Sequence, residues 1–359
     1  MGAFALLGSI LLAPSAFADP CDSGCSHDPS SSATRQVSGE NNSVRVSARD
    51  ESKASATVTG KRNDSITTAN NDSGIPFGGA FTIIKGNDNK VITKADHGSL
   101  VGNGVTGDHN TAIAKAHHGS LAANDVTGDH NTAIVKADHG SLAGNGVKGD
   151  RNTVVAKAGD GSSAGNGVTG DHNTAIAKAD DRSLGANDVT GDHNTAIAKA
   201  DHGSGAGNGA DNGAGNRVQG DRNTVIAKAD NGSRAVNDVK GDRNTAIAIA
   251  NHGGSATNNV DGNYSTATSY ADGAGSFATS TANRGGKADT IALAGGKATA
   301  SATGSGQTAT ALAIGSGYTA TATATTISGT TSCNPGTGGG VAFAITTSNG
   351  HLTDACYKT

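Results

Sequence analysis

One repeat of this chain, residues 107–127, reads GDHNTAIAKAHHGSLAANDVT. From position 110 to position 116, Asn and Ala alternate with Thr, Ile and Lys, and alternation with a period of two is typical of a β-strand. Gly, Asn and Asp cluster between the apolar segments and favour turns. The second half of the repeat predicts another short strand around Val126, so that one repeat holds two strands and two turns.

The phrase Gly-Asp-His/Arg-Asn that opens this repeat recurs at a fixed spacing, which is the signature of a solenoid. Copies spaced by 21 residues begin at Gly107, Gly128, Gly149, Gly170 and Gly191, and two more begin at Gly220 and Gly241 after an interval eight residues longer. Degenerate copies precede and follow them. The sequence therefore predicts an all-β fold, a parallel β-solenoid (a β-roll or β-helix) with two-stranded coils of 21 residues.

Coils stacked about 4.8 Å apart turn equivalent residues into columns. We expect columns of Asn, Val and Ala to form a thin interior, with the Asn side chains joined as an amide ladder. Lys on the Ile side favours solvent there, although the opposite assignment of inside and outside stays open. The outer Thr and Ile columns then form a stripe that we take as a candidate interaction face. Its residues are Thr111, Ile113, Thr132, Ile134, Thr174, Ile176, Thr195, Ile197, Thr224, Ile226, Thr245 and Ile247.

Composition restricts the possible functions. Aromatic residues make up 3% of the chain, Trp is absent and Gly occurs 54 times, so a thick globular core is excluded. A net charge of −4 provides no basic field for nucleic acid, which we do not expect as a partner. Ser, His and Asp occur as repeated columns, whereas a catalytic group is normally a single constellation. We therefore predict no enzyme, no catalytic residue and no cofactor.

The His residues suggest an alternative, because stacked imidazoles can bind a transition metal. One column holds His109, His130, His172 and His193, and a second holds His97, His118, His139, His202 and His252. Arg replaces His in other copies of the first column, at Arg151, Arg222 and Arg243. Because Arg is not a metal ligand, we interpret both columns as solvated turn positions and predict no metal site. A calcium site is not predicted either, since each corner supplies a single Asp.

The N-terminus and the cysteines indicate export. Residues 1–18 read as a signal peptide, with Ala16 and Ala18 at the cleavage positions, although no Lys or Arg follows Met1 and the true start stays open. Cys21 and Cys25 lie near one end of the chain, and Cys333 and Cys356 lie near the other. In an oxidising compartment, cysteines at the ends of a solenoid predict disulfides that close its caps.

Five segments follow from these patterns. They are a signal peptide (1–18), an N-terminal segment with a Cys pair (19–38), the 21-residue solenoid repeats (39–262), Ala/Thr/Gly-rich short β repeats (263–330) and a C-terminal cap hairpin (331–359). We expect Cys333 and Cys356 to close the hairpin, while the overall disulfide connectivity stays open. The insertion in residues 203–216 is expected to form a loop.

Two stretches resemble known families. The phrase Gly-x-x-Asn-x-Ala, as in Gly107 to Ala112, resembles the half-repeat of curlin-type fibre subunits, secreted bacterial proteins that stack strand-turn-strand repeats into surface fibres. The later Ala-x-Ala-x-Gly phrases, as in Ala309 to Gly315, resemble the β-roll heads of trimeric autotransporter adhesins. Both resemblances imply an extracellular structural or adhesive protein.

The expected partner is therefore a cell-surface or extracellular polymer or protein, or a second copy of the chain. No transmembrane anchor is expected in the mature chain. The alternative function is a secreted ligand-binding solenoid, with metal at the His columns or with ice or a polymer at the Thr/Ile face. The identity of the partner and fibre formation stay open.

Overall fold

The computed structural model describes residues 25–27, 30–71, 78–201, 213–325, 328–337 and 339–359. The chain divides into an N-terminal unit, residues 1–181, and a C-terminal unit, residues 182–359. Within each unit, successive strands alternate between two sheets, and equivalent residues of neighbouring coils pair in parallel, as Leu121 pairs with Leu142. The predicted all-β parallel solenoid with two-stranded coils of 21 residues is confirmed.

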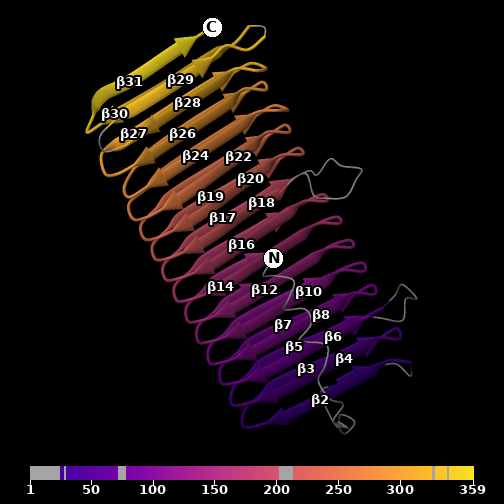
Figure 1. The fold of residues 1–359 in the computed structure, drawn as a ribbon. Helices are drawn as coiled ribbons and strands as arrows, with labels where there is room; N and C mark the ends of the chain where they lie inside the picture. Colours follow the sequence, from indigo (N-terminus) through magenta and orange to yellow (C-terminus); the bar gives the residue numbers. More distant parts are fainter. Residues whose placement is uncertain (1–24, 28–29, 72–77, 202–212, 326–327, 338) are drawn as a thin grey trace. The chain divides into compact units, whose positions relative to one another are not determined.

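In the N-terminal unit, the odd-numbered strands form one sheet and the even-numbered strands form the other (Figure 1). We call these the odd sheet and the even sheet. The odd strands are β1 (Cys25–His27), β3 (Ser43–Arg49), β5 (Asp64–Asn70), β7 (Lys90–Asp96), β9 (Thr111–Ala116), β11 (Thr132–Ile134), β13 (Thr153–Ala156) and β15 (Thr174–Ala179). The even strands are β2 (Ser32–Ser38), β4 (Lys53–Thr59), β6 (Gly79–Lys85), β8 (Leu100–Thr106), β10 (Leu121–Thr127), β12 (Leu142–Lys148) and β14 (Ser163–Thr169).

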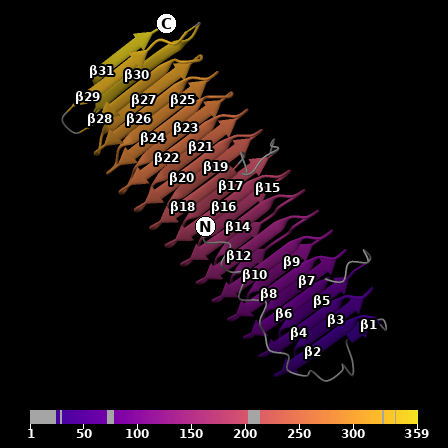
Figure 2. The same cartoon turned by 45° about the vertical axis from the view of Figure 1, so that its right-hand side comes forward.

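The C-terminal unit has the same two-sheet arrangement, which Figure 2 shows from a second side. Its odd sheet contains β17 (Thr195–Asp201), β19 (Thr224–Asp230), β21 (Thr245–Asn251), β23 (Thr266–Asp272), β25 (Lys287–Leu293), β27 (Gln307–Ile314), β30 (Val341–Ser348) and β31 (His351–Lys358). Its even sheet contains β16 (Leu184–Thr190), β18 (Gly213–Gln219), β20 (Arg234–Lys240), β22 (Ser255–Asp261), β24 (Phe277–Asn283), β26 (Lys297–Thr303), β28 (Thr319–Ala324) and β29 (Gly329–Asn334).

The space between the two sheets is filled by small side chains. In β9, Ala112, Ala114 and Ala116 are fully buried, and in β10 Val126 is fully buried. Thr, Ile and Lys of the same odd strand remain partly exposed. The Ala side is therefore inside and the Ile side outside, which settles the assignment that the sequence left open. Small residues suit this interior because the two sheets of each coil are joined by short turns.

Buried Asn residues form two kinds of column. At the corners, Asn110 Oδ1 accepts a hydrogen bond from the backbone N–H of Asn131 (2.8 Å), and its Nδ2 donates to the carbonyl of Gly128 (2.7 Å). These corner Asn residues mainly hold backbone groups, and amide–amide bonds join the start of this column, where Asn89 Nδ2 donates to Asn63 Oδ1 (3.1 Å). A longer amide ladder lies in the even strands, where Asn124 Nδ2 donates to Asn103 Oδ1 (2.9 Å).

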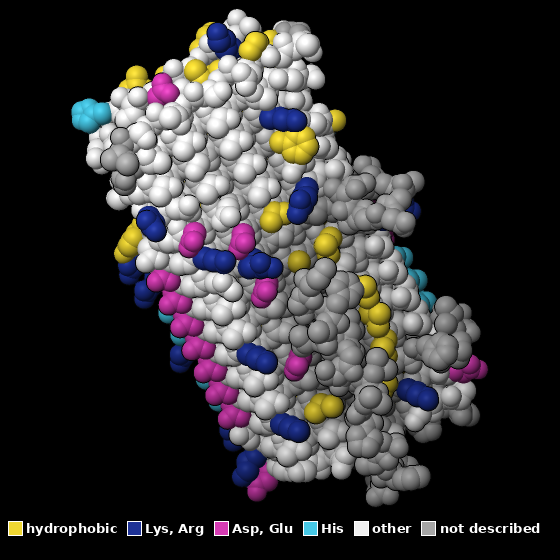
Figure 3. Space-filling view, in the orientation of Figure 1, with side chains coloured by type: hydrophobic (Ala, Val, Ile, Leu, Met, Phe, Trp, Pro, Cys, Tyr) yellow, Lys and Arg dark blue, Asp and Glu magenta, His cyan; other side chains and the backbone are white. Residues whose placement is uncertain are grey.

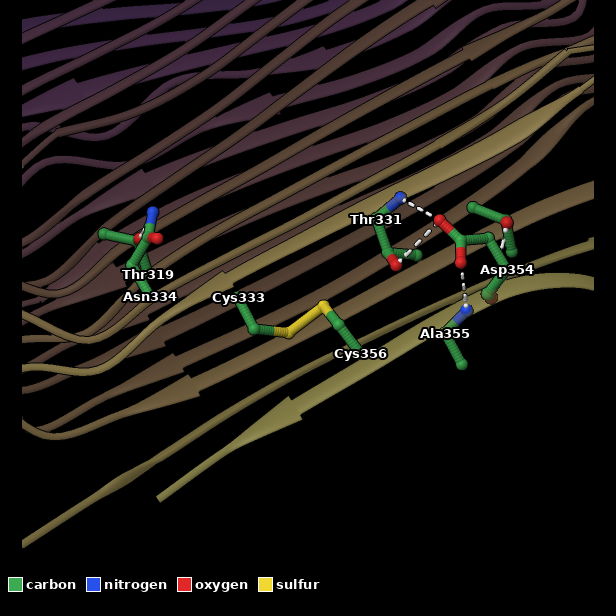
Figure 4. The surroundings of a disulfide bond; sticks show 8 residues. Thr319, Thr331, Cys333, Asn334, Asp354, Ala355 and Cys356 are labelled. Atoms are coloured by element: carbon green, nitrogen blue, oxygen red, sulfur yellow. Dashed lines mark hydrogen bonds between the residues drawn. A yellow bond between two sulfur atoms is a disulfide. The ribbon is translucent and has the colours of Figure 1, made fainter.

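The C-terminal end of the solenoid is covered by a reversal of chain direction. Strand β29 pairs antiparallel with β28, and β30 pairs antiparallel with both β27 and β31. Cys333 and Cys356 form a disulfide, as predicted, with their Cα atoms 5.9 Å apart (Figure 4). The bond joins β29 to β31, rather than two strands of one hairpin as we expected. It therefore ties the last strand of the even sheet to the last strand of the odd sheet.

Asp354 protects the edge of this cap. Its carboxylate accepts hydrogen bonds from the backbone N–H (2.7 Å) and the hydroxyl (3.0 Å) of Thr331 in β29 (Figure 4). These two hydrogen bonds lower the pKa of the Asp354 carboxyl below its usual value, and the bond from the backbone N–H has the larger effect. Burial opposes them more weakly. A strand-edge donor that would otherwise be open to another chain is thus occupied.

The start of the solenoid differs from the prediction, and some predicted features lie outside the described residues. The solenoid begins earlier than residue 39, because β2 already pairs in parallel with β4. The predicted signal peptide, Cys21, the side chain of Cys25 and His202 lie outside the described residues, as does most of the expected loop in 203–216. In the described ranges, no helix has the length and apolar character needed to cross a bilayer.

Candidate interaction face

The predicted Thr and Ile columns lie on the outer surface of the odd sheet. In the N-terminal unit, Thr111 pairs with Thr132 and Ile113 pairs with Ile134, so each column is in register from coil to coil. All four side chains are half-buried, because each is flanked by its copies above and below. The columns continue to Thr174 and Ile176. The result is a flat surface of alternating methyl and hydroxyl groups.

The same columns occur separately in the C-terminal unit. Thr195, Thr224 and Thr245 pair in sequence, as do Ile197, Ile226 and Ile247. All the residues predicted for the interaction face therefore point outward from an odd sheet.

Charged columns border this face. Lys94 Nζ lies 3.9 Å from Asp96, and Lys178 Nζ lies 3.8 Å from Asp180, so an acidic column offsets the stacked Lys residues. Exposed pairs of this kind contribute little to stability. Their effect is to keep the outer face near neutrality and hydrated along one side.

The His residues stack at the corners in left-handed backbone conformations. His109 and His130 have ring centroids 4.8 Å apart with their planes at 4°, and His118 stacks on His97 (4.4 Å) and on His139 (4.6 Å). Parallel rings direct their nitrogen lone pairs the same way and not toward a common point. The part of the chain that the structure describes contains no group of three or more His, Cys, Asp or Glu residues suited to a metal. The geometry therefore favours turn positions over a metal site.

Stacking perturbs the titration of His118. Burial lowers the pKa of its imidazole below the usual value of 6.5, and the charges of His97, His139 and His117 lower it further, while Asp138 opposes them. His97 and His139 stack on the two sides of His118, and their charges oppose its protonation. The neutral form of His118 is consequently favoured in the folded chain.

This shift predicts the direction of a pH effect. Because the folded protein binds the His118 proton less readily than the unfolded chain, stability is lost as the pH falls from about 6.5 through the folded pKa. We expect an NMR titration to place the His118 midpoint below 6.5. The variants His97→Asn and His139→Asn should each raise it, since Asn tolerates the left-handed corner and carries no charge. His172→Asn, at the other corner column, is the control and should leave the midpoint unchanged.

The corner Asp residues form a third column. The Asp129 carboxylate accepts the backbone N–H of Asp108 (2.7 Å), and the Asp150 carboxylate accepts that of Asp129 (2.7 Å). Figure 3 shows acidic side chains in a row of this kind along one edge. Each carboxylate thus holds the turn of the preceding coil, which gives these residues a structural role that does not require calcium.

Sequence reasoning missed two features. In the even strands, the sequence interpretation used Val126 and overlooked Asn124, two residues earlier. Asn recurs at that position with the same spacing as at the corners. An apolar row on the C-terminal unit was also missed. Its signal was Ile249, which stands where the preceding coil has Lys228.

No family model, curated protein or solved structure matches this chain. Its function is therefore inferred from its own residues.

Proposed function

We propose that this chain is an exported structural or adhesive protein, and that it contacts an extracellular polymer or surface through the Thr/Ile columns of the odd sheet. The observation that carries the proposal is the in-register pairing of identical outward residues, Thr111 with Thr132 and Ile113 with Ile134. Such a face repeats every ~4.8 Å along the stack. A polymer of identical units likewise presents the same chemical groups at a regular interval.

The physical basis of binding is preorganisation. The outward side chains are held by strands paired on both sides, so little conformational entropy remains to be lost on contact. The methyl groups of Ile and Thr can cover the apolar faces of a polymer, while the Thr hydroxyls hydrogen-bond to its polar groups. The resemblances to curlin-type subunits and autotransporter heads support the same extracellular class. The alternative of metal at the His columns is disfavoured by the parallel rings.

A sedimentation assay with crystalline cellulose, chitin and peptidoglycan tests this proposal. We expect wild-type protein to pellet with at least one polymer, and the double variant Ile113→Lys, Ile134→Lys to lose affinity by about tenfold or more, because two hydrated charges then interrupt the contact. The matched control is Leu121→Lys, Leu142→Lys, which makes the same change in neighbouring coils on the even sheet.

Three results would contradict the proposal: no polymer is bound, the Ile variant binds as wild type does, or the Leu control loses binding equally. Inhibition of ice recrystallisation without polymer binding would favour the alternative function, with ice as the ligand of the same face. Circular dichroism of each variant verifies that the β-structure is retained.

A further inference from the structure

An apolar row runs along the outer face of the odd sheet in the C-terminal unit. In successive strands, from β21 through β31, each member pairs in register with the next. We call this row the apolar ladder; its members are Ile249, Tyr270, Ile291, Leu312, Phe343 and Tyr357.

The ladder occupies the column that holds Lys elsewhere in the odd sheet. Lys199 pairs with Lys228, and Lys228 pairs with Ile249, after which every position is apolar or aromatic. The column beside it changes in the same way, from Asp272 to Leu293 and Ile314. The first column is apolar from β21 onward and the second from β25 onward, so the apolar surface is two residues wide from β25 to the end of the sheet's parallel part at β27.

This surface is accessible. Ile291 is 43% exposed and Tyr357 is 61% exposed, and the other ladder residues are half-buried by their neighbours in the row. The chain has few aromatic residues, 3% of its length, yet three of the six ladder positions are aromatic. Exposed apolar surface of this extent marks a contact site.

The charges around the ladder are already paired within the chain. Lys287 Nζ lies 3.3 Å from Asp289 in β25. Asp272 contacts His252 Nδ1 (2.8 Å) and accepts a hydrogen bond from the hydroxyl of Tyr270 (3.2 Å). A neutral apolar face does not select a charged polymer or an anionic membrane, and it does not repel a copy of itself.

The face is also self-complementary. If a two-fold axis runs along the strands between β25 and β27, Ile291 of one copy meets Leu312 of the other, and Leu293 meets Ile314. Tyr270 then meets Phe343, so apolar residues oppose apolar residues throughout. Two sheets packed face to face in this way form the kind of apolar layer found in β-sandwiches.

The area of the whole sheet face approaches that of a standard interface. Six strands at about 4.8 Å spacing span about 29 Å, and the full seven-residue width, the ladder and its polar flanks together, spans about 23 Å, which gives roughly 670 Å² per copy. A standard protein interface buries about 800 Å² per partner. We propose that the apolar ladder is the surface through which two copies of this chain associate, side by side and antiparallel.

Sedimentation equilibrium of the full chain tests this inference. We expect a dimer at about 100 µM and a monomer for the double variant Ile291→Lys, Leu312→Lys, whose dissociation constant should rise by about a hundredfold. The substitutions should not disturb folding, because Lys is the residue of this column at Lys199 and Lys228. The control is Thr299→Lys, at an exposed position of β26 in the even sheet, which should remain dimeric.

A monomeric wild type overturns the inference, as does a ladder variant that still dimerises or a Thr299→Lys control that also dissociates. A monomeric wild type that binds phosphatidylcholine vesicles would instead assign the ladder to a lipid surface. Mixing Ile291→Cys protein with Leu312→Cys protein under mild oxidation should yield mainly the mixed cross-linked dimer; predominance of like-with-like dimers would contradict the antiparallel arrangement. Sedimentation is measured without polymer, and the polymer assay changes Ile113 and Ile134 of the N-terminal unit, so failure of one proposal is distinguishable from failure of the other.

Discussion

Substitution of the corner glycine Gly128 by Ala is expected to destabilise the N-terminal unit by about 3 to 5 kcal/mol. Gly128 has a φ of +121°, a region that L-residues with a side chain rarely adopt. A Cβ on Gly128 would also overlap the carbonyl oxygen of Gly149 in the next coil and lie 2.7 Å from its carbon. Because that obstacle is backbone, it can move only if the two coils separate.

The control for Gly128→Ala is Gly140→Ala, at the other corner of the same coil. Gly140 has a φ of +70°, and a Cβ there meets no heavy atom within 4 Å. Its substitution should cost only about 1 to 2 kcal/mol, from the left-handed conformation alone. Guanidinium unfolding followed by far-UV circular dichroism gives both values. Equal losses for the two variants would show that close coil contact does not determine the corner residue.

Substitution of Asn124 by Leu is the second change with a large expected effect, a loss of about 3 to 5 kcal/mol. Asn124 is fully buried, and its Nδ2 donates to Asn103 Oδ1 (2.9 Å) and to the carbonyl of Ile113 (2.8 Å). Its Oδ1 accepts from Asn145 Nδ2 (3.0 Å). The amide thus joins three coils and both sheets. Leu would remove all three hydrogen bonds and leave the buried Asn103 Oδ1 without the donor it has in the folded chain. The Ile113 carbonyl would keep its bond from the backbone N–H of Val135 (2.8 Å), and Asn145 Nδ2 would keep its bond to the carbonyl of Ile134 (2.8 Å).

Asp125→Leu is the matched control for Asn124→Leu, because Asp125 is the next residue of β10 and points outward. It introduces the same side chain into the same strand without removing a buried hydrogen bond, and we expect a change within about 0.5 kcal/mol. Guanidinium unfolding followed by far-UV circular dichroism again gives the two free energies of unfolding. If Asn124→Leu were as stable as its control, the amide ladder would be dispensable to the fold.

The period and the alternation of residues were sufficient to predict the solenoid. A strand such as 110–116 alternates small residues with Lys and Ile, and only one of these two sets can lie in a thin interior. The Lys residues on the Ile side favoured an outward position for Thr111 and Ile113, and the structure decided it. The Cys333–Cys356 pair was expected from its place at the C-terminal end, while Cys21 and Cys25 left the overall connectivity open until the structure showed this bond.

The cap and the two ladder residues that it contributes were not predictable in this way, whereas the first four ladder residues keep the 21-residue spacing. Phe343 joins Leu312 in the ladder although the two lie outside the 21-residue spacing, because the chain reverses direction before β30. Tyr357 joins Phe343 through a second reversal, with a register shift between Thr346 and Thr347. Periodicity cannot give the register of antiparallel strands, since that register depends on the length of each connection.

By itself, the sequence determined the coil length and the two strands of each coil, because these depend on local alternation and on a repeat that keeps its phase. It favoured the Ala side of each strand as the interior, and the tertiary structure decided that assignment. Only the tertiary structure decided which atoms the buried Asn residues use. Asn110 lies at a corner, where backbone groups are the nearest partners, whereas Asn124 lies within a sheet, where the amide of the neighbouring coil is in reach. The tertiary structure also brought Phe343 and Tyr357 into the column that Ile249 begins, since antiparallel pairing joins them to residues at distances along the chain that depart from the 21-residue spacing.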